Sequence, residues 1–218
     1  MRRNSSTVVV LAGQVPGEVL AAATRSLNVT LYRPEALAGS GDGDGDALTA
    51  AAAALQRAGR STSPYALVPA DPLAAVAARW QEMWDLAQQP GPAAFELEAA
   101  QALAAWRAGR FELPDYYLVL AREPAPAPDG GPLGEGAVPS PDFYLGPLRS
   151  VRPHRVVLVP ATEPAQQAAG VLHALGALRH GPWWPGLDQV IEAARRFYPA
   201  SLSETDSAIL AGAPGRAG

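Results

Sequence analysis

Five short runs of hydrophobic residues, rich in β-branched and aromatic side chains and bounded by Gly, Pro or Asp, predict buried strands. The runs are Thr7 to Ala12, Val29 to Tyr32, Tyr65 to Val68, Tyr116 to Ala121 and Arg155 to Val159. Alanine-rich stretches with helical signals separate the early runs, so strand and helix alternate. This alternation predicts an α/β, Rossmann-like fold in three layers, with a mostly parallel sheet and helices on both of its faces.

A second pattern, with apolar residues three or four positions apart, predicts helices. Asp71 followed by Pro72 is typical of a helix start, with a capping side chain and a proline in the first turn, and Pro16 fits a first turn as well. Gly109 is predicted to end a helix that runs from about Ala93 to Ala108. Two apolar stripes at this spacing are Leu73, Val76, Ala77, Trp80, Met83 and Trp84, and Leu187, Val190, Ile191, Ala194, Phe197 and Tyr198.

Two segments rich in Gly, Pro and Asp, 39–46 and 123–141, fit neither pattern and are predicted to be mobile loops. We interpret residues 1–202 as a single domain with the second loop as an excursion, and 203–218 as a mobile tail. The alternative, in which 142–202 form a separate module, stays open. Asp142 to Leu145 is a candidate sixth strand, added antiparallel to 155–159 at one edge of the sheet.

Composition removes several classes of chemistry. The 218 residues contain no Cys and no Lys, so all 17 basic side chains are arginines. Disulfides, thiolate nucleophiles, cysteine-based metal sites, a phosphate-binding Walker lysine and a Schiff-base lysine are therefore excluded. No cofactor is predicted. Because no apolar run approaches the roughly 20 residues of a membrane helix and the first run lacks signal-peptide features, we expect a soluble, cytoplasmic protein without a membrane partner.

The ends of the predicted strands supply the candidate ligand-binding residues. In an open parallel sheet, ligands bind beyond the carboxyl ends of the strands, where strand order reverses. The polar residues at these ends are Gln14, Arg33, Asp71, Arg122 and Glu163. Arginines mixed with carboxylates suit a polar or phosphorylated ligand. The alternative for Asp71 is that it only caps a helix.

Three further motifs give weaker signals. The turn from Ala12 to Gly17 lacks the G-x-G-x-x-G spacing, although a helix N-terminus after it could hold an anion. The acidic run Gly41 to Asp46 lacks the Gly and Glu of a calcium loop at its sixth and twelfth positions. Of the three histidines, only His173 and His180 have helical spacing, at the end of a predicted helix, so no metal site is predicted.

Two clusters are candidate partner surfaces. Arg149, Arg152, His154 and Arg155 form the densest basic cluster, which suits either phosphate contacts or a solvated strand edge. Trp183 and Trp184 lie in a Pro- and Gly-bounded loop, where they suit either a protein partner or local core packing. The net charge of −4 and a pI near 5.4 argue against broad nucleic-acid binding.

We therefore expect a noncatalytic binding or interaction protein, with a polar or anionic small ligand at the carboxyl ends of the strands. A hydrolase or transferase that acts on a polar or phosphorylated metabolite is the first alternative. Nucleic-acid binding through residues 149–155 is the second.

Overall fold

The chain forms one five-stranded sheet in which all strands run parallel, as a computed structural model shows for residues 6–34, 44–84, 91–122, 141–161 and 163–197. The strands are β1 (Thr7–Gly13), β2 (Val29–Leu31), β3 (Tyr65–Val68), β4 (Tyr116–Arg122) and β5 (Val156–Ala161). Their order is β2-β3-β1-β4-β5. In the β1–β3 pair, Thr7 lies opposite Tyr65 and Val10 opposite Val68. The predicted parallel α/β architecture is confirmed.

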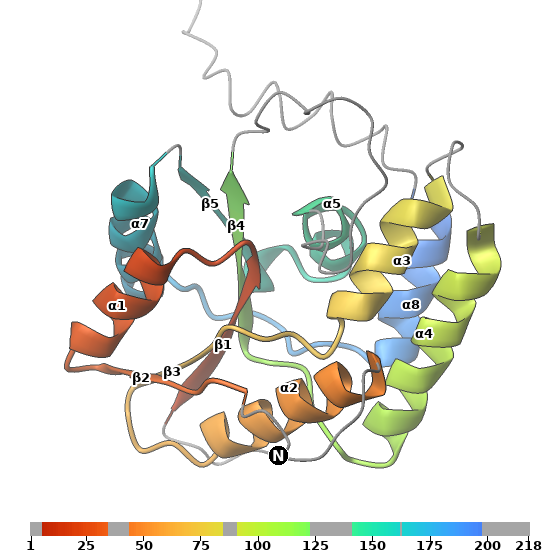
Figure 1. Cartoon of the computed structure of the whole chain (residues 1–218), viewed down its shortest axis with the longest axis horizontal. Helices are drawn as coiled ribbons and strands as arrows, with labels where there is room; N and C mark the ends of the chain where they lie inside the picture. Colours follow the sequence, from red (N-terminus) through yellow and green to blue (C-terminus); the bar gives the residue numbers. More distant parts are fainter. Residues whose placement is uncertain (1–5, 35–43, 85–90, 123–140, 162, 198–218) are drawn as a thin grey trace, which may run out of the picture.

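Helices cover both faces of the sheet, which makes three layers (Figure 1). The longer helices are α1 (Gly17–Arg25), α2 (Asp44–Ala58), α3 (Ala74–Trp84), α4 (Gly91–Arg107), α7 (Pro164–Gly176) and α8 (Leu187–Arg196). Helices α1 and α7 pack side by side on one face. Helices α2, α3, α4 and α8 lie on the other face.

Successive side chains of β1 point to opposite faces of the sheet, and each face has its own hydrophobic core. Val8, Val10 and Ala12 pack toward α2, α3, α4 and α8, whereas Val9 and Leu11 pack toward α1 and α7. Each of these five side chains is at most 2% exposed. A strand buried on both faces reads as a continuous apolar run, which is why the sequence predicted it so clearly.

The predicted antiparallel strand at Asp142 to Leu145 is wrong, because residues 141–155 form short helical turns. These are α5 (Pro141–Phe143), the π-helical turn η1 (Tyr144–Leu148), α6 (Arg149–Val151) and the 3₁₀ turn η2 (Pro153–Arg155). Phe143, Tyr144 and Leu148 recur at helical spacing and are all buried in the larger core. An apolar run this short cannot be distinguished from a buried helical turn by periodicity.

Helix α2 corrects a second prediction, since it begins at Asp44, inside the predicted loop 39–46. The rest of that loop, and 123–140 of the other, lie outside the described residues.

Helix α4 ends at Arg107, and Gly109 adopts a positive φ of 68°, as the predicted helix end requires. Helix α7 ends at Gly176, so His173 lies in its last turn but His180 lies beyond it, contrary to the prediction.

Candidate functional site

The carboxyl ends of all five strands lie at the same edge of the sheet, because the strands are parallel. Four of the five predicted site residues follow these ends and Arg122 is the last residue of β4, but they differ in exposure. Gln14, Arg33 and Glu163 are exposed and Asp71 is buried; the side chain of Arg122 lies outside what the structure describes.

The chain leaves β1 through α1 on one face of the sheet, whereas it leaves the neighbouring strand β3 through α3 on the other. The crevice that parallel folds use for ligands is therefore next to β1.

The turn from β1 into α1 depends on Gly13. Its φ is 92°, and a Cβ atom at this position would lie 2.6 Å from the backbone oxygen of Leu120 on β4. Only glycine combines this conformation with so close an approach of two strands. The turn then delivers Pro16 as the cap of α1, whose carbonyl accepts hydrogen bonds from the N–H groups of Val19 and Leu20.

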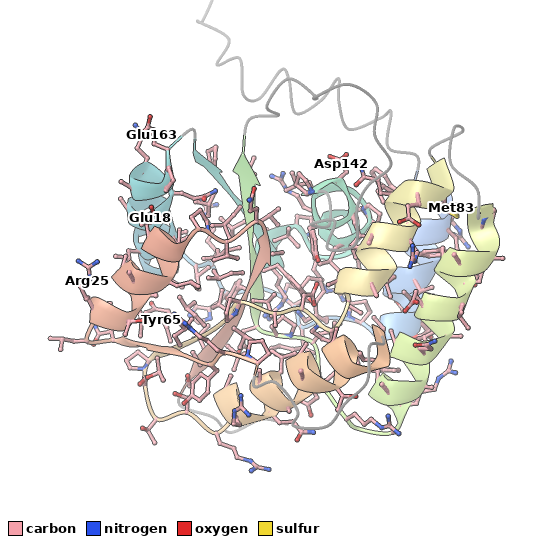
Figure 2. All side chains as sticks on the ribbon, viewed as in Figure 1. Glu18, Arg25, Tyr65, Met83, Asp142 and Glu163 are labelled. Atoms are coloured by element: carbon pink, nitrogen blue, oxygen red, sulfur yellow. The ribbon has the colours of Figure 1, made fainter. Side chains whose placement is uncertain are left out.

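The N-terminal ends of α1 and α7 already carry acidic side chains. Glu18 lies in the first turn of α1, and Glu163 is the capping residue of α7. Both are exposed and lie at the same end of the two adjacent helices (Figure 2). Two carboxylates complement the positive ends of the helix dipoles and repel a bound anion. The first turn is therefore a poor anion site, despite its free backbone N–H groups.

Asp71 is a buried cap rather than an accessible ligand. Its Oδ1 accepts hydrogen bonds from the N–H of Leu73 (3.0 Å) and the hydroxyl of Tyr117 (3.2 Å), and its Oδ2 accepts one from the hydroxyl of Tyr144 (2.8 Å). Burial raises the pKa of Asp71 to about 6, although the three hydrogen bonds oppose this rise. Its carboxylate in turn raises the pKa of both tyrosines, adding to the larger effect of their burial.

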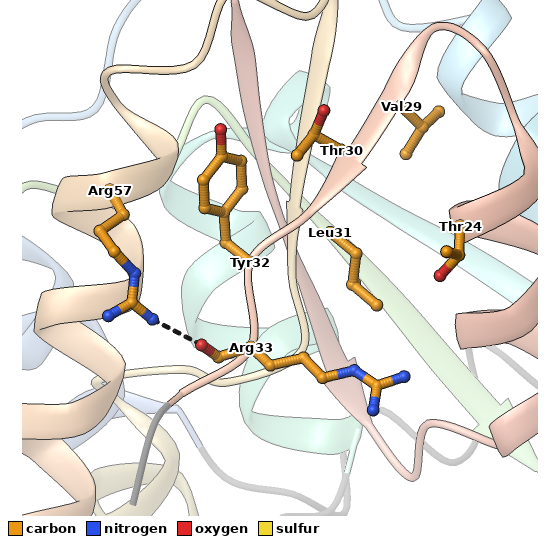
Figure 3. A pocket seen from close by; sticks show the side chains of 7 residues that line it. All are labelled: Thr24, Val29, Thr30, Leu31, Tyr32, Arg33 and Arg57. Carbon is orange, nitrogen blue, oxygen red and sulfur yellow. Dashed lines mark hydrogen bonds between the residues drawn. The ribbon is translucent and has the colours of Figure 1, made fainter. Parts of the chain in front are cut away.

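Arg33 lies at an open depression of about 560 Å³ beside the edge strand β2 (Figure 3). The lining residues come from α1, from the end of β2 and from α2, and they are Thr24, Val29, Thr30, Leu31, Tyr32, Arg33 and Arg57. None of these seven described residues is acidic. An Nη atom of Arg57 donates a hydrogen bond to the backbone oxygen of Arg33 (2.6 Å), while the Arg33 side chain extends to the opposite side of the strand.

The open edge of β2 also presents backbone donors to this depression. The N–H of Tyr32 donates to the carbonyl of Leu67 on β3, and the carbonyl of Asn28 accepts from the N–H of Tyr65. Because successive residues of a strand direct their peptide groups to opposite sides, Leu31 and Arg33 direct theirs away from β3. The outward N–H and carbonyl groups of Leu31 and Arg33 thus lie beside the Arg33 guanidinium group, on residues that line the depression.

The sequence named Arg33 as a candidate ligand-binding residue, but it did not name Arg57, the second arginine that lines the depression. Arg57 is the last-turn arginine of α2, and no local pattern separates it from other helical arginines. The only available signal was topological, because a helix that connects two neighbouring parallel strands must pass close to the edge strand. The strand order that brings it there was not readable from the sequence.

At the opposite, amino-terminal edge of the sheet, Arg155 is a structural residue. It is 6% exposed, and its three guanidinium nitrogens donate to the carbonyls of Pro182 (2.6 Å), Asp115 (2.8 Å) and Gly181 (2.9 Å). The hypothesis of a solvated basic edge at 149–155 is therefore wrong for Arg155. Its guanidinium group is not available to a nucleic acid.

The two tryptophans of the loop between α7 and α8 have different roles. Trp184 is 5% exposed and donates its indole N–H to the carbonyl of Pro114 (2.6 Å), so it packs in the core and cannot be a partner surface. Trp183 is 45% exposed. The guanidinium carbon of Arg155 lies 4.5 Å from the centroid of its ring.

Comparison with family models, curated proteins and solved structures finds no match to this chain. Within the part of the chain that the structure describes, no three His, Asp or Glu side chains come together as metal ligands. No described helix is long and apolar enough to cross a membrane.

Proposed function

We propose that this protein is a noncatalytic binding protein for a small anionic ligand, a carboxylate or a phosphate, held at the open edge of β2. The observation that carries the proposal is the depression beside β2, where the exposed guanidinium group of Arg33 meets outward backbone N–H groups and no acidic side chain from the described lining. Guanidinium groups bind carboxylates and phosphates through two parallel, charge-assisted hydrogen bonds.

Binding is favoured over catalysis because the depression beside β2 brings together no second strand-end candidate among the residues with described side chains. Of the five predicted site residues, only Arg33 lines the depression. Asp71, the natural candidate for a general base, has both carboxylate oxygens engaged by Leu73, Tyr117 and Tyr144. A general base must reach a substrate proton directly or through one water molecule.

The test is a thermal-unfolding titration with inorganic phosphate, and separately with succinate, at low ionic strength. A ligand that binds only the folded state raises the midpoint of unfolding with its concentration. We expect this rise for the unmodified protein and for Arg107→Gln, which removes an exposed arginine at the distant end of α4. For Arg33→Gln we expect about tenfold weaker binding, because a charge-assisted hydrogen-bond pair is lost.

Two outcomes would contradict the proposal. One is an equal rise for Arg33→Gln and Arg107→Gln, which would mean that phosphate acts without the β2 edge. The other is no rise with either anion. The unfolding midpoint without ligand serves as the folding control for each variant.

A further inference from the structure

The loop between α7 and α8, residues 177–186, crosses the amino-terminal edge of the sheet from one helical layer to the other (Figure 1). Five side-chain hydrogen bonds to its carbonyls or from its own indole hold it. Arg155 binds the carbonyls of Pro182 and Gly181, Arg152 Nε binds that of Trp183 (2.5 Å), and the Tyr116 hydroxyl binds that of Arg179 (2.9 Å). Arg155 also binds the carbonyl before β4, and the indole of Trp184 anchors the loop to Pro114.

This support fixes an exposed aromatic ring. Arg155 lies between two rings, 4.5 Å from the centroid of Trp183 and 5.4 Å from that of Tyr116. One face of Trp183 is thus covered by a guanidinium group, and the residue as a whole is 45% exposed. A large side chain that is already held in place loses little conformational entropy when a partner covers it.

The segment that carries Trp183 is rich in arginine, although the whole chain is acidic and the exposed Asp188 carboxylate lies beside Gly186 at the end of the loop. Between residues 143 and 187 the sequence holds four arginines, Arg149, Arg152, Arg155 and Arg179, and one acidic residue. That acidic residue, Glu163, lies at the opposite edge of the sheet. Two exposed histidines, His154 and His180, belong to the same surface, where His154 contacts Gly181.

Asp115 is the acidic residue directly before β4 in the sequence. Asp115 Oδ2 accepts a hydrogen bond from the N–H of Val8 (2.7 Å), so it is directed toward β1. Arg152 is partly buried, and Arg179 is exposed. The surface made of Arg152, His154, Arg179, His180 and Trp183, here called the Trp183 surface, therefore combines an aromatic ring with cations.

We infer that the Trp183 surface binds single-stranded nucleic acid, with one base stacked on Trp183 and the flanking phosphates contacted by Arg152 and Arg179. A stacking platform beside cationic side chains is the common design of such sites, and it tolerates any base because every base has a π-face. The surface is a loop at the sheet edge rather than a helix or a two-stranded ribbon that could enter the major groove of a duplex. This inference is independent of the anion site at β2.

The experiment measures fluorescence anisotropy of a labelled twelve-residue oligothymidylate at low salt. We expect binding that weakens about tenfold in Trp183→Ala, because the stacked base is lost, and that is largely retained in Trp183→Phe. Arg179→Gln should also weaken binding, whereas the matched variant Arg196→Gln, at the exposed far end of α8, should not. With two phosphate contacts, the logarithm of the binding constant should fall with the logarithm of salt concentration with a slope of about −1.4.

Three outcomes would overturn the inference. The first is no binding of the oligothymidylate, or binding that Trp183→Ala and Arg179→Gln leave unchanged. The second is equal affinity for a duplex of the same length, which stacking on Trp183 does not explain. The third is tighter binding of a labelled oligoglutamate peptide, which would assign the surface to an acidic protein partner. Circular dichroism of each variant separates a lost contact from a lost fold.

Discussion

At the residue scale, the clearest case is Asp71, a buried carboxylate whose described hydrogen-bond partners are all uncharged. Its pKa is raised from 3.8 to about 6, so the folded state holds a proton that the unfolded state has released between these two pH values. Folding stability is therefore greatest below pH 4 as far as this group is concerned, and it falls as pH rises through 6. This pKa shift makes the free energy of unfolding about 3 kcal/mol lower at neutral pH than below pH 4.

The first prediction follows from this fall in folding stability as the pH rises. Asp71→Asn keeps the oxygen that caps Leu73 and carries an NH₂ group that can donate to the Tyr144 hydroxyl, but it cannot ionise. We expect the variant to be at least as stable as the unmodified protein at pH 7 and to lose the decline in unfolding free energy between pH 4 and 6. Urea unfolding at several pH values measures this.

The matched control is Asp188→Asn, the same substitution at an exposed position in the first turn of α8. It should change stability by less than about 1 kcal/mol and leave the shape of the pH dependence unaltered. A decline between pH 4 and 6 that persists in Asp71→Asn would show that other groups cause it.

The capping role of Asp71 was predictable from the sequence, since Asp followed by Pro marks a helix start. Its two tyrosine partners were not. Tyr117 lies 46 residues away on β4 and Tyr144 lies 73 residues away in η1. Contacts between such distant residues depend on the strand order and on the helical form of 141–151, and a single sequence fixes neither.

At the element scale, the tight contact between β1 and β4 explains why the turn after β1 needs glycine. We predict that Gly13→Ala destabilises the fold by more than about 2 kcal/mol, because the positive φ alone costs an alanine roughly 1–2 kcal/mol and its Cβ would also lie 2.6 Å from the Leu120 carbonyl oxygen. Chemical denaturation gives this difference in unfolding free energy.

Substitutions at two other glycines separate the cost of the positive φ from the cost of the close contact with Leu120. Gly109 has a positive φ but no atom near its hypothetical Cβ, so Gly109→Ala should cost only about 1 kcal/mol. Gly17 has neither constraint, and Gly17→Ala should be neutral or slightly stabilising in the first turn of α1. Equal costs at all three positions would contradict the role assigned to the β1–β4 contact.

Secondary structure was most predictable where periodicity was strong. The stripe Leu187, Val190, Ile191 and Ala194 is fully buried in α8, as its spacing predicted. The prediction failed at 142–145, where four residues cannot define a period, and at Asp44, where Gly and Asp residues concealed the start of α2. Local propensity at both places is weak, so tertiary packing decides the structure.

At the scale of the whole molecule, the two proposed surfaces lie on different parts of the sheet. The depression runs along the lateral edge strand β2, and the Trp183 surface lies at the amino-terminal ends of the strands. The sequence predicted that Arg33 follows the carboxyl end of a strand, and the structure has it shortly after β2. It did not show that Arg57 joins Arg33, or that Arg155 is buried as the anchor of the loop between α7 and α8, since both facts depend on strand order and on how the chain crosses between layers.

The most direct test of the proposed function is a titration of the ¹⁵N-labelled protein with inorganic phosphate, followed by NMR. The account predicts that the largest chemical-shift changes occur at the backbone amides of Leu31 and Arg33 and at the Arg33 Nε–H, and that they saturate together with one dissociation constant. Changes of comparable size at Gly17 and Glu18 would place the anion at the α1 N-terminus instead. Changes confined to Arg152, Arg179 and Trp183, or no changes at all, would contradict an anion site at the edge of β2.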